Sequence, residues 1–350
     1  MSFKSKINII RRNLMRSLTR NVGTTQLVSD GATGPLIEIK RVLICRPNHR
    51  LGNLLLITPL VQEIENTFPD CKIDLFIKGG LGPIVFKNYK NVDRFIVLPK
   101  KPFNELVKYA KVWMSLKKHK YDIAINIAQS SSSGRISAQF SNSKYKFFGD
   151  DIEEIQSKYD DYVHMAKSPV YYFRYCLDKL GYKGSDNPIP SLNLKLSAVE
   201  IAEGQKALKQ IVDNGKKTIS IFTFATGEKC YSESWWEIFY GRLLKEYPDY
   251  NIIEILPVEN VSQIGFKAAT FYSKDIREMG ALIANTEVFI GADSGIVHLA
   301  SASQTPTVGL FSVTQTSIYE PYGNKNIAIN TNTTTIDEWI TIVNGILNKD

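Results

Sequence analysis

Several common features are missing from this sequence, and each absence limits where the protein can work. Its 350 residues contain no apolar run of about 18 or more, so no membrane-spanning helix is expected. The first residues lack the apolar region and the cleavage site of a secretory signal peptide. Cysteine is scarce and shows neither paired nor metal-like spacing, which is typical of a reducing compartment; the four are Cys45, Cys71, Cys176 and Cys230. We therefore expect a cytoplasmic protein, either free or peripheral on the inner face of the cytoplasmic membrane.

Two widespread nucleotide-binding motifs are also absent. No Gly-x-Gly-x-x-Gly follows an expected strand, and no Gly-x-x-x-x-Gly-Lys-Ser/Thr occurs anywhere in the chain. Dinucleotide-binding and P-loop functions therefore lack support.

Acidic residues are missing from the N-terminal segment, where none precedes Asp30. Six of the eight net positive charges lie there, and a nucleic-acid enzyme usually spreads such charge over a folded domain, so no nucleic-acid partner is expected. Residues 3–20 repeat apolar side chains at spacings of three and four, which predicts an amphipathic helix. Two alternatives stay open: contact with an anionic membrane surface, or a helix that docks on the protein or frays.

Strands and helices alternate along the remaining chain, which predicts an α/β fold with two doubly wound units. The expected organisation is a basic segment and linker (1–35), an N-terminal domain (36–184), a C-terminal domain (185–334) and a C-terminal helix (335–350). Three local expectations are a helix over Leu54–Phe68 kinked at Pro59, a Ser-rich loop over Gln129–Arg135, and a helix capped by Ser234 with Glu237.

A strand, a small-residue turn, a helix and a second strand are expected between residues 287 and 311. The turn, Gly291–Gly295, would lie at the carboxyl end of a buried parallel strand, where open α/β sheets bind ligands. The following helix would direct its free N–H groups and positive dipole end at the turn, which suits a phosphate. The plainer alternative is that Asp293 or Ser294 only caps the helix and that His298 is a packed histidine.

The longer string around this turn resembles the C-terminal signature of glycosyltransferase family 9, the bacterial heptosyltransferases. It reads Asp-Ser-Gly-x-x-His-Leu-Ala, then Pro-Thr-Val-Gly-Leu-Phe, then Pro-Tyr-Gly. The resemblance implies a GT-B architecture, with two Rossmann-like α/β domains facing across a cleft. It also implies that Asp293, Ser294, Gly295 and His298 hold the diphosphate of a nucleotide-activated sugar.

A second stretch, Gly52 to Pro59, is similar to the family pattern Gly-Asp-x-Leu-x-x-Thr-Pro. The Asp of that pattern is the presumed general base, but this chain has Asn53 in its place. An amide cannot accept a proton near neutral pH, so Asn53 would orient the acceptor hydroxyl instead. His49 is then a candidate base, and a solvated loop residue is its plainer interpretation.

Other loops contain further candidates, of which the resemblance assigns two. Thr226 and Lys229 lie where the family places a Thr and a Lys on the donor diphosphate, and Glu259 lies where an acid could bind the ribose. Arg50, Ser132 and Arg135 are expected in loops at the carboxyl ends of first-domain strands, where they would hold a polar or anionic acceptor. Each also fits ordinary loop polarity.

The sequence therefore predicts an inverting glycosyltransferase that moves a sugar, most simply heptose from ADP-heptose, to a lipopolysaccharide-type or other cell-surface glycan or glycolipid acceptor. No cofactor is expected, and since no Asp-x-Asp occurs, neither is a metal. Three alternatives stay open: a family 9-like enzyme with another nucleotide sugar, a nucleotide-sugar-binding protein that has lost catalysis with Asn53, and a sugar-nucleotide epimerase of related architecture.

Overall fold

The computed structural model describes residues 22–25, 37–100 and 104–348 of the chain. The amphipathic helix predicted over residues 3–20 lies outside the described residues, and so do both alternatives considered for it, membrane contact and docking on the protein. Among the described residues, no helix is both long enough and apolar enough to span a membrane.

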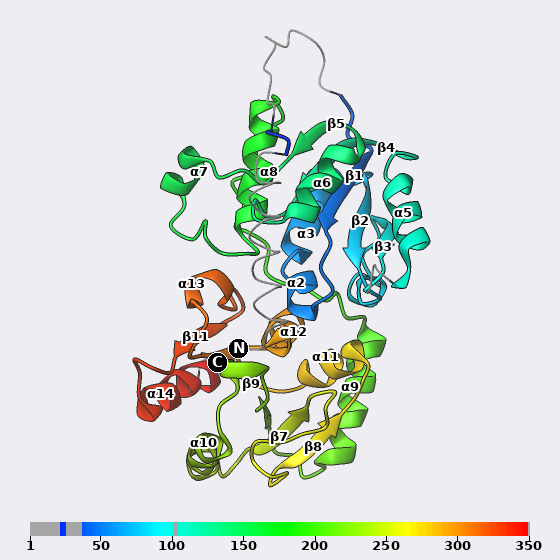
Figure 1. Cartoon of the computed structure of the whole chain (residues 1–350). Helices are drawn as coiled ribbons and strands as arrows, with labels where there is room; N and C mark the ends of the chain where they lie inside the picture. The colour runs from blue at the N-terminus through cyan, green and yellow to red at the C-terminus, as the bar shows by residue number, and fades with distance from the viewer. Residues whose placement is uncertain (1–21, 26–36, 101–103, 349–350) are drawn as a thin grey trace, which may run out of the picture. The chain divides into compact units, whose positions relative to one another are not determined.

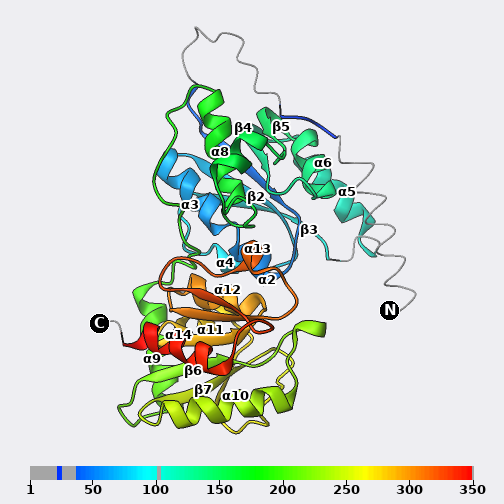
Figure 2. The same ribbon diagram turned by 90° about the vertical axis from the view of Figure 1, so that its left-hand side faces the viewer.

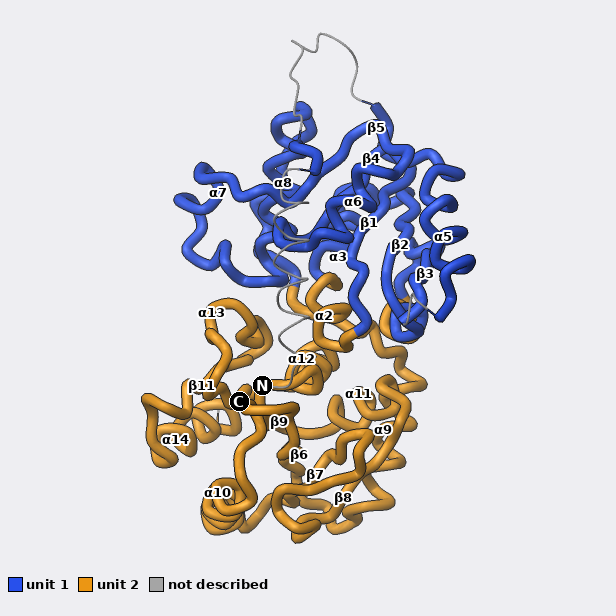
Figure 3. Tube along the Cα trace, in the orientation of Figure 1, with its two compact units in different colours: residues 1–49, 59–83, 89–190 blue, residues 50–58, 84–88, 191–350 orange. Residues whose placement is uncertain are grey.

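The chain divides into two compact units, which Figure 3 shows in different colours. The first contains residues 1–49, 59–83 and 89–190, and the second contains residues 50–58, 84–88 and 191–350. The final change of unit therefore follows Pro190, and two short segments from the first half of the chain belong to the second unit. The C-terminal helix packs into the core of the second unit through Trp339, Ile340 and Val343.

The first unit is built on a five-stranded parallel sheet with the order β3-β2-β1-β4-β5 (Figure 1). Helices lie on both sides of this sheet, as the side view in Figure 2 shows. The strands are β1 (Arg41–Arg46), β2 (Lys72–Lys78), β3 (Val92–Leu98), β4 (Lys120–Asn126) and β5 (Asn142–Phe147). The helices are α3 (Thr58–Thr67), α5 (Leu106–Ser115), α6 (Ser132–Phe140), α7 (Glu153–Lys158) and α8 (Ser168–Lys179), and α4 (Gly82–Val85) crosses the change of unit.

The second unit is built on a six-stranded parallel sheet with the order β11-β10-β9-β6-β7-β8. The strands are β6 (Thr218–Phe222), β7 (Asn251–Leu256), β8 (Ala269–Tyr272), β9 (Val288–Ala292), β10 (Thr307–Phe311) and β11 (Ile327–Asn330). The helices are α2 (Leu51–Leu55), α9 (Ala198–Ile211), α10 (Glu233–Glu246), α11 (Ile276–Ile283), α12 (Gly295–Ala302), α13 (Thr316–Tyr319) and α14 (Ile336–Leu347), with a 3-10 turn η2 (Gly227–Lys229).

The central strands of the second unit are completely buried, so apolar side chains pack on both faces of its sheet. Strands β6, β9 and β10 are buried at every position, as parallel strands covered on both faces must be. On one face, Trp236 and Phe239 of α10 and Trp339 of α14 form a cluster of aromatic rings that packs on Ile221 and Ile290. The α/β fold predicted from the sequence is present in each unit.

The structure corrects three boundaries that the sequence predicted. The helix predicted over Leu54–Phe68 is two helices, α2 and α3, because the backbone turns at Leu56–Ile57 before Pro59. The predicted cap Ser234 is wrong: it lies within α10, and Ser232 is the cap, accepting from the backbone N–H of Trp235 at 3.2 Å. The loop expected over Gln129–Arg135 is also shorter, because α6 begins at Ser132.

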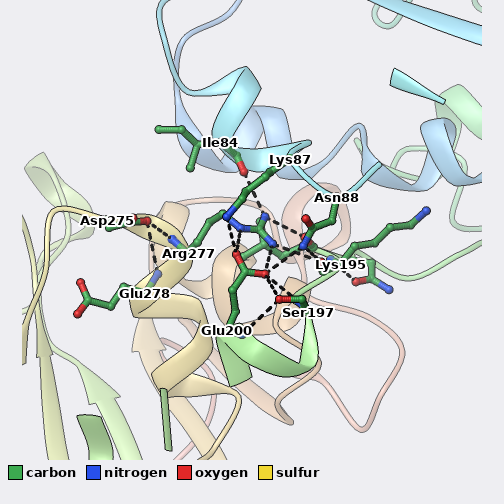
Figure 4. Close-up of polar contacts among 11 residues, drawn as sticks. Ile84, Lys87, Asn88, Lys195, Ser197, Glu200, Asp275, Arg277 and Glu278 are labelled. Carbon is green, nitrogen blue, oxygen red and sulfur yellow. Dashed lines mark hydrogen bonds and ion pairs between the residues drawn. The ribbon is translucent and has the colours of Figure 1, made fainter. Parts of the chain in front are cut away.

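A buried arginine fixes the segment 84–88 within the second unit (Figure 4). Arg277 of α11 donates to both carboxylate oxygens of Glu200, at 2.6 and 2.9 Å. Its remaining contacts are backbone carbonyls, which include that of Ile84 at 3.1 Å. Asn88 donates to Glu200 at 3.0 Å, so the same carboxylate holds both α11 and this segment.

Candidate donor-binding site

Two loops meet at the carboxyl ends of neighbouring strands in the second unit. Strands β6 and β9 pair in parallel, with Phe222 opposite Gly291, so their carboxyl ends lie side by side. The loop after β6 continues into the 3-10 turn that ends at Lys229, and the loop after β9 carries Asp293. The Nζ of Lys229 lies 2.6 Å from a carboxylate oxygen of Asp293. Two residues predicted from separate motifs are thus in direct contact.

The turn after β9 is held in place by its backbone. Asp293 is buried, and its N–H donates to the carbonyl of Leu310 on β10 at 2.9 Å. Ser294 is the N-cap of α12, and its Oγ accepts from the N–H of Ile296 at 3.3 Å. The capping role considered from the sequence is therefore correct for Ser294. It leaves the start of α12, with its positive dipole end, at the carboxyl end of the sheet.

The predicted Gly52 motif lies against this turn. A Cβ placed on Gly52 would lie 2.8 Å from Cδ2 of His298, closer than ordinary packing allows. A Cβ placed on Gly295 would lie 3.2 Å from the backbone nitrogen of Gly52. Helix α2 therefore packs on the start of α12 through two glycines, as the adjacent labels in Figure 3 indicate. Asn53, half-buried, is the next residue of α2.

Lys229 offsets the negative charge of Asp293 at this turn. The Asp293 side chain is only 7% exposed, and its carboxylate would repel a phosphate. The Lys229 ammonium beside it offsets that negative charge. The Lys229 side chain is 37% exposed, so it remains accessible from solvent. A bound diphosphate would therefore compete with Asp293 for this ammonium.

The remaining predicted donor residues are more exposed. Thr226 is the exposed residue before the 3-10 turn that carries Lys229. Glu259 is exposed in the turn after β7, three residues beyond the end of the strand at Leu256. The structure thus brings Asp293, Ser294, Gly295, His298 and Lys229 together and places Thr226 on the same loop as Lys229.

A buried acid that the sequence analysis did not select supports the Lys229 loop. Glu254 on β7 accepts from Thr223 Oγ1 at 2.5 Å and from Ser262 Oγ at 2.6 Å. Burial raises the pKa of this carboxyl, and the two hydroxyl donors lower it in part. Thr223 directly follows β6, so Glu254 fixes the base of the loop that leads to Lys229. The sequence signal was a single acid inside the apolar strand NIIEIL.

The candidates for the acceptor and for the base lie on several elements. His49 is exposed in the first unit, and its Cβ lies 3.3 Å from the Cβ position of Gly79, which follows β2. Arg50 is exposed and occupies the N-cap position of α2 in the second unit. Ser132 is the half-buried first residue of α6.

Arg135 is a correction to the sequence analysis. It lies inside α6 and is 2% exposed, whereas the sequence predicted an accessible loop residue. Its guanidinium pairs with Asp150 at 2.8 Å and donates to the carbonyls of Val22, Gly23 and Phe148. These bonds occupy the side chain in holding residues 22–25 and 148–150, so it is a structural residue.

Within the described part of the chain, no three His, Cys, Asp or Glu side chains come together as a set of metal ligands. The expectation of a metal-independent reaction stays a prediction.

Comparisons with known proteins agree with the C-terminal motif. Residues 273–338, which contain the α12 turn, match the model of "Glycosyltransferase family 9 (heptosyltransferase)". The chain is 22% identical over 292 residues to lipopolysaccharide heptosyltransferase 3 of Escherichia coli, covering 79% of this chain and 85% of that protein.

Solved structures extend the likeness over both units. A family 9 glycosyltransferase from Veillonella parvula superimposes with a TM-score of 0.69 at 16% identity, covering 90% of this chain and 99% of that one. The E. coli heptosyltransferase WaaC, solved with ADP, gives a TM-score of 0.61 at 14% identity over 87% of this chain and 99% of that one. The predicted fold class, with two Rossmann-like α/β domains, is confirmed.

Proposed function

We propose that this chain is a member of glycosyltransferase family 9 and that it transfers heptose from ADP-heptose to a lipopolysaccharide-type acceptor with inversion at the anomeric carbon. The observation that carries this proposal is the contact of Lys229 with Asp293 at the start of α12. It joins a cation, a helix N-terminus and a close-packed glycine turn at one edge of a parallel sheet, which is the chemistry that a diphosphate requires. The name of the E. coli relative supports the acceptor class, and the ADP in the WaaC structure supports the nucleotide.

The donor step follows from these groups. The diphosphate of the donor would lie over the start of α12, where Lys229 and the backbone N–H groups neutralise it. An acceptor hydroxyl oxygen attacks the anomeric carbon from the opposite side, and the bond from that carbon to the diphosphate breaks. ADP leaves with the electron pair of that bond, and the charge that develops on it is stabilised by the same donors. His298 is the further donor that we assign to the diphosphate, and Thr226 and Glu259 are the flanking candidates.

The acceptor hydroxyl must also lose a proton, and here the chain departs from its family. Asn53 cannot take this proton, so we assign it to orienting the hydroxyl and assign His49 as the base. Arg50 and Ser132 remain the candidates for binding a polar or anionic acceptor. Because Asn53 replaces the Asp of the family pattern, a nucleotide-sugar-binding protein without transfer activity is the second candidate function.

A transfer assay with mass detection of both products tests these proposals. With ADP-heptose and a heptose-deficient lipopolysaccharide, we expect acceptor-dependent release of ADP that persists in a metal chelator. Tight ADP binding with no product would favour the binding protein, and turnover with a UDP- or GDP-sugar alone would replace the donor.

Two variants identify the base. We expect His49→Gln to lower kcat by about 100-fold or more while leaving ADP affinity unchanged, which is the usual size for loss of a general base. If Asn53→Asp creates activity in an inactive wild type, position 53 is a lost base and the second candidate function gains. If Asn53→Asp leaves an active enzyme unchanged or slower, position 53 is not a weakened base.

We also propose a cytoplasmic location. All four cysteines are free, and three of them are buried, which is compatible with a reducing compartment.

A further inference from the structure

One helix of the first unit has apolar side chains on its solvent side. The inner side of α5 packs Tyr109, Val112 and Trp113 against the sheet core around Phe76. The outer side carries Val107 and Met114, which are 70% and 57% exposed, and Leu106 at the start is 61% exposed. Val107 and Met114 are about two helical turns apart, so they lie on the same side of α5.

Lysines surround these apolar side chains. The stretch from Glu105 to Lys120 contains five lysines and one acid, and that acid is paired with Lys108 at 2.9 Å. Lys111 lies four residues after Val107 and three before Met114, so it shares their side of the helix. Lys117 and Lys118 are exposed in the turn that follows α5. Within the described residues, no carboxylate forms an ion pair with Lys111, Lys117 or Lys118.

A hollow next to the end of α5 adds a second cationic feature. It has a volume of about 590 Å³ and is lined by Lys117 and Lys146 together with polar groups of Ser141 and Asn142. Lys146 is partly buried, and both this burial and the charge of Lys117 lower its pKa. The Nζ of Lys146 donates to the carbonyl of Gln139 at 2.7 Å. An anionic group placed in the hollow would be attracted by the positive charges of both lysines.

The combination fits a lipid surface better than a protein surface. Lysine is depleted at protein–protein interfaces, whereas at a membrane its methylene stem lies against acyl chains while the ammonium reaches the headgroups. Buried apolar side chains and the attraction of lysines to anionic lipids both strengthen binding to a bilayer surface.

We propose that the outer side of α5 docks this protein on an anionic lipid bilayer. Val107 and Met114 enter the boundary between headgroups and acyl chains, and the lysines at 111, 117 and 118 contact headgroup phosphates. The hollow at Lys117 and Lys146 receives one such phosphate. The proposal does not depend on sugar transfer, and its residues are separate from those assigned to the donor.

Vesicle sedimentation with the full chain tests the proposal. The vesicles contain phosphatidylcholine with about one-third phosphatidylglycerol, and phosphatidylcholine alone is the neutral comparison. Wild type should bind the anionic vesicles, and binding should weaken as salt is raised. We expect Val107→Ser/Met114→Ser and Lys111→Gln/Lys118→Gln each to lower the partition coefficient about tenfold or more.

A matched control comes from α9 in the second unit. Val199 is 72% exposed and Lys209 is exposed on that helix, so Val199→Ser/Lys209→Gln changes similar side chains. This variant should bind vesicles like the wild type, and thermal melts confirm folding of all three variants. Rates of transfer to a water-soluble acceptor fragment should be unchanged in all of them, which separates docking from catalysis.

Three results would overturn the proposal. In the first, wild type does not bind the anionic vesicles. In the second, both α5 variants bind as wild type does, which would place membrane binding elsewhere, for example at residues 3–20. In the third, the control variant loses as much binding as the α5 variants. If the wild type does not bind vesicles but captures an acidic protein, and the α5 variants do not capture it, this surface binds a protein partner instead.

Discussion

Gly52 and His298 lie far apart in the sequence, yet there is no room between them for a methyl group. The Cβ position of Gly52 is 2.8 Å from Cδ2 of the His298 ring. This contact joins the two stretches that resemble the family motifs, because Gly52 begins the first and His298 belongs to the second. Both lie in the second compact unit, so the N-terminal motif helps to build the proposed donor site.

Adding a methyl group at position 52 should therefore displace the histidine. We expect Gly52→Ala to cost about 1–3 kcal/mol of unfolding free energy, as overpacked sites do, and to weaken ADP binding about tenfold. Urea denaturation and calorimetry measure the two effects. Gly345→Ala is the control, because nothing lies within 4 Å of its Cβ position in α14, and it should be neutral or stabilising. Equal effects of the two substitutions would contradict a tight contact at Gly52.

The arginine at the centre of Figure 4 should be important for stability. Arg277 is 4% exposed, and its removal leaves Glu200 and three backbone carbonyls without their donor. We expect Arg277→Met to cost about 3–5 kcal/mol, the usual cost of breaking a buried ion pair. Lys206→Met, which breaks an exposed pair with Glu203, should change stability by less than about 1 kcal/mol. If the two losses in urea denaturation were similar, the Arg277 contacts would not stabilise the unit.

The same pair should make stability depend on pH. Arg277 and the capping bonds from Ser197 hold the pKa of Glu200 well below its ordinary value of 4.5. A depressed pKa in the folded state stabilises the fold above the unfolded pKa, and this stabilisation is lost as the pH falls below it. The stability advantage of wild type over Glu200→Gln should therefore be constant above about pH 5 and shrink toward pH 3.

Glu203→Gln provides the comparison, since Glu203 is exposed and forms an ion pair with the exposed Lys206. Loss of such an exposed pair should change stability by less than about 1 kcal/mol. A Glu200→Gln difference that stays constant down to about pH 3 would show that the folded state does not favour the Glu200 carboxylate.

The turn of the proposed donor site was predictable because every part of it is local in the sequence. The buried strand, the Asp293–Gly295 turn and the start of α12 follow one another directly, so period and composition locate them. The neighbouring position of Lys229 could also be anticipated, since its loop follows another buried strand. The contact itself needed the strand order, which places β6 beside β9.

Other features could not be read from the sequence because they depend on distant packing. Arg135 has the composition of a loop residue, but Asp150 and the carbonyls of residues 22 and 23 bury it. Segment 84–88 contains no signal that it joins the second unit, because Arg277 and Glu200 hold it there. Strand β5 has the polar pattern NSKYKF, which does not predict a buried strand and is compatible with its place at the edge of the sheet.

Calorimetric titration of ADP into the wild type and Lys229→Gln tests whether Lys229 binds the diphosphate of the donor. Lys217→Gln is the matched control, because Lys217 pairs with Glu287 at 3.5 Å at the opposite ends of the same strands. We expect wild type and Lys217→Gln to bind ADP equally and more tightly than UDP or GDP. Lys229→Gln should lose about tenfold or more in affinity, as expected for a charged hydrogen bond to phosphate. Absence of ADP binding to wild type, or equal affinities of all three proteins, would contradict the proposed donor site.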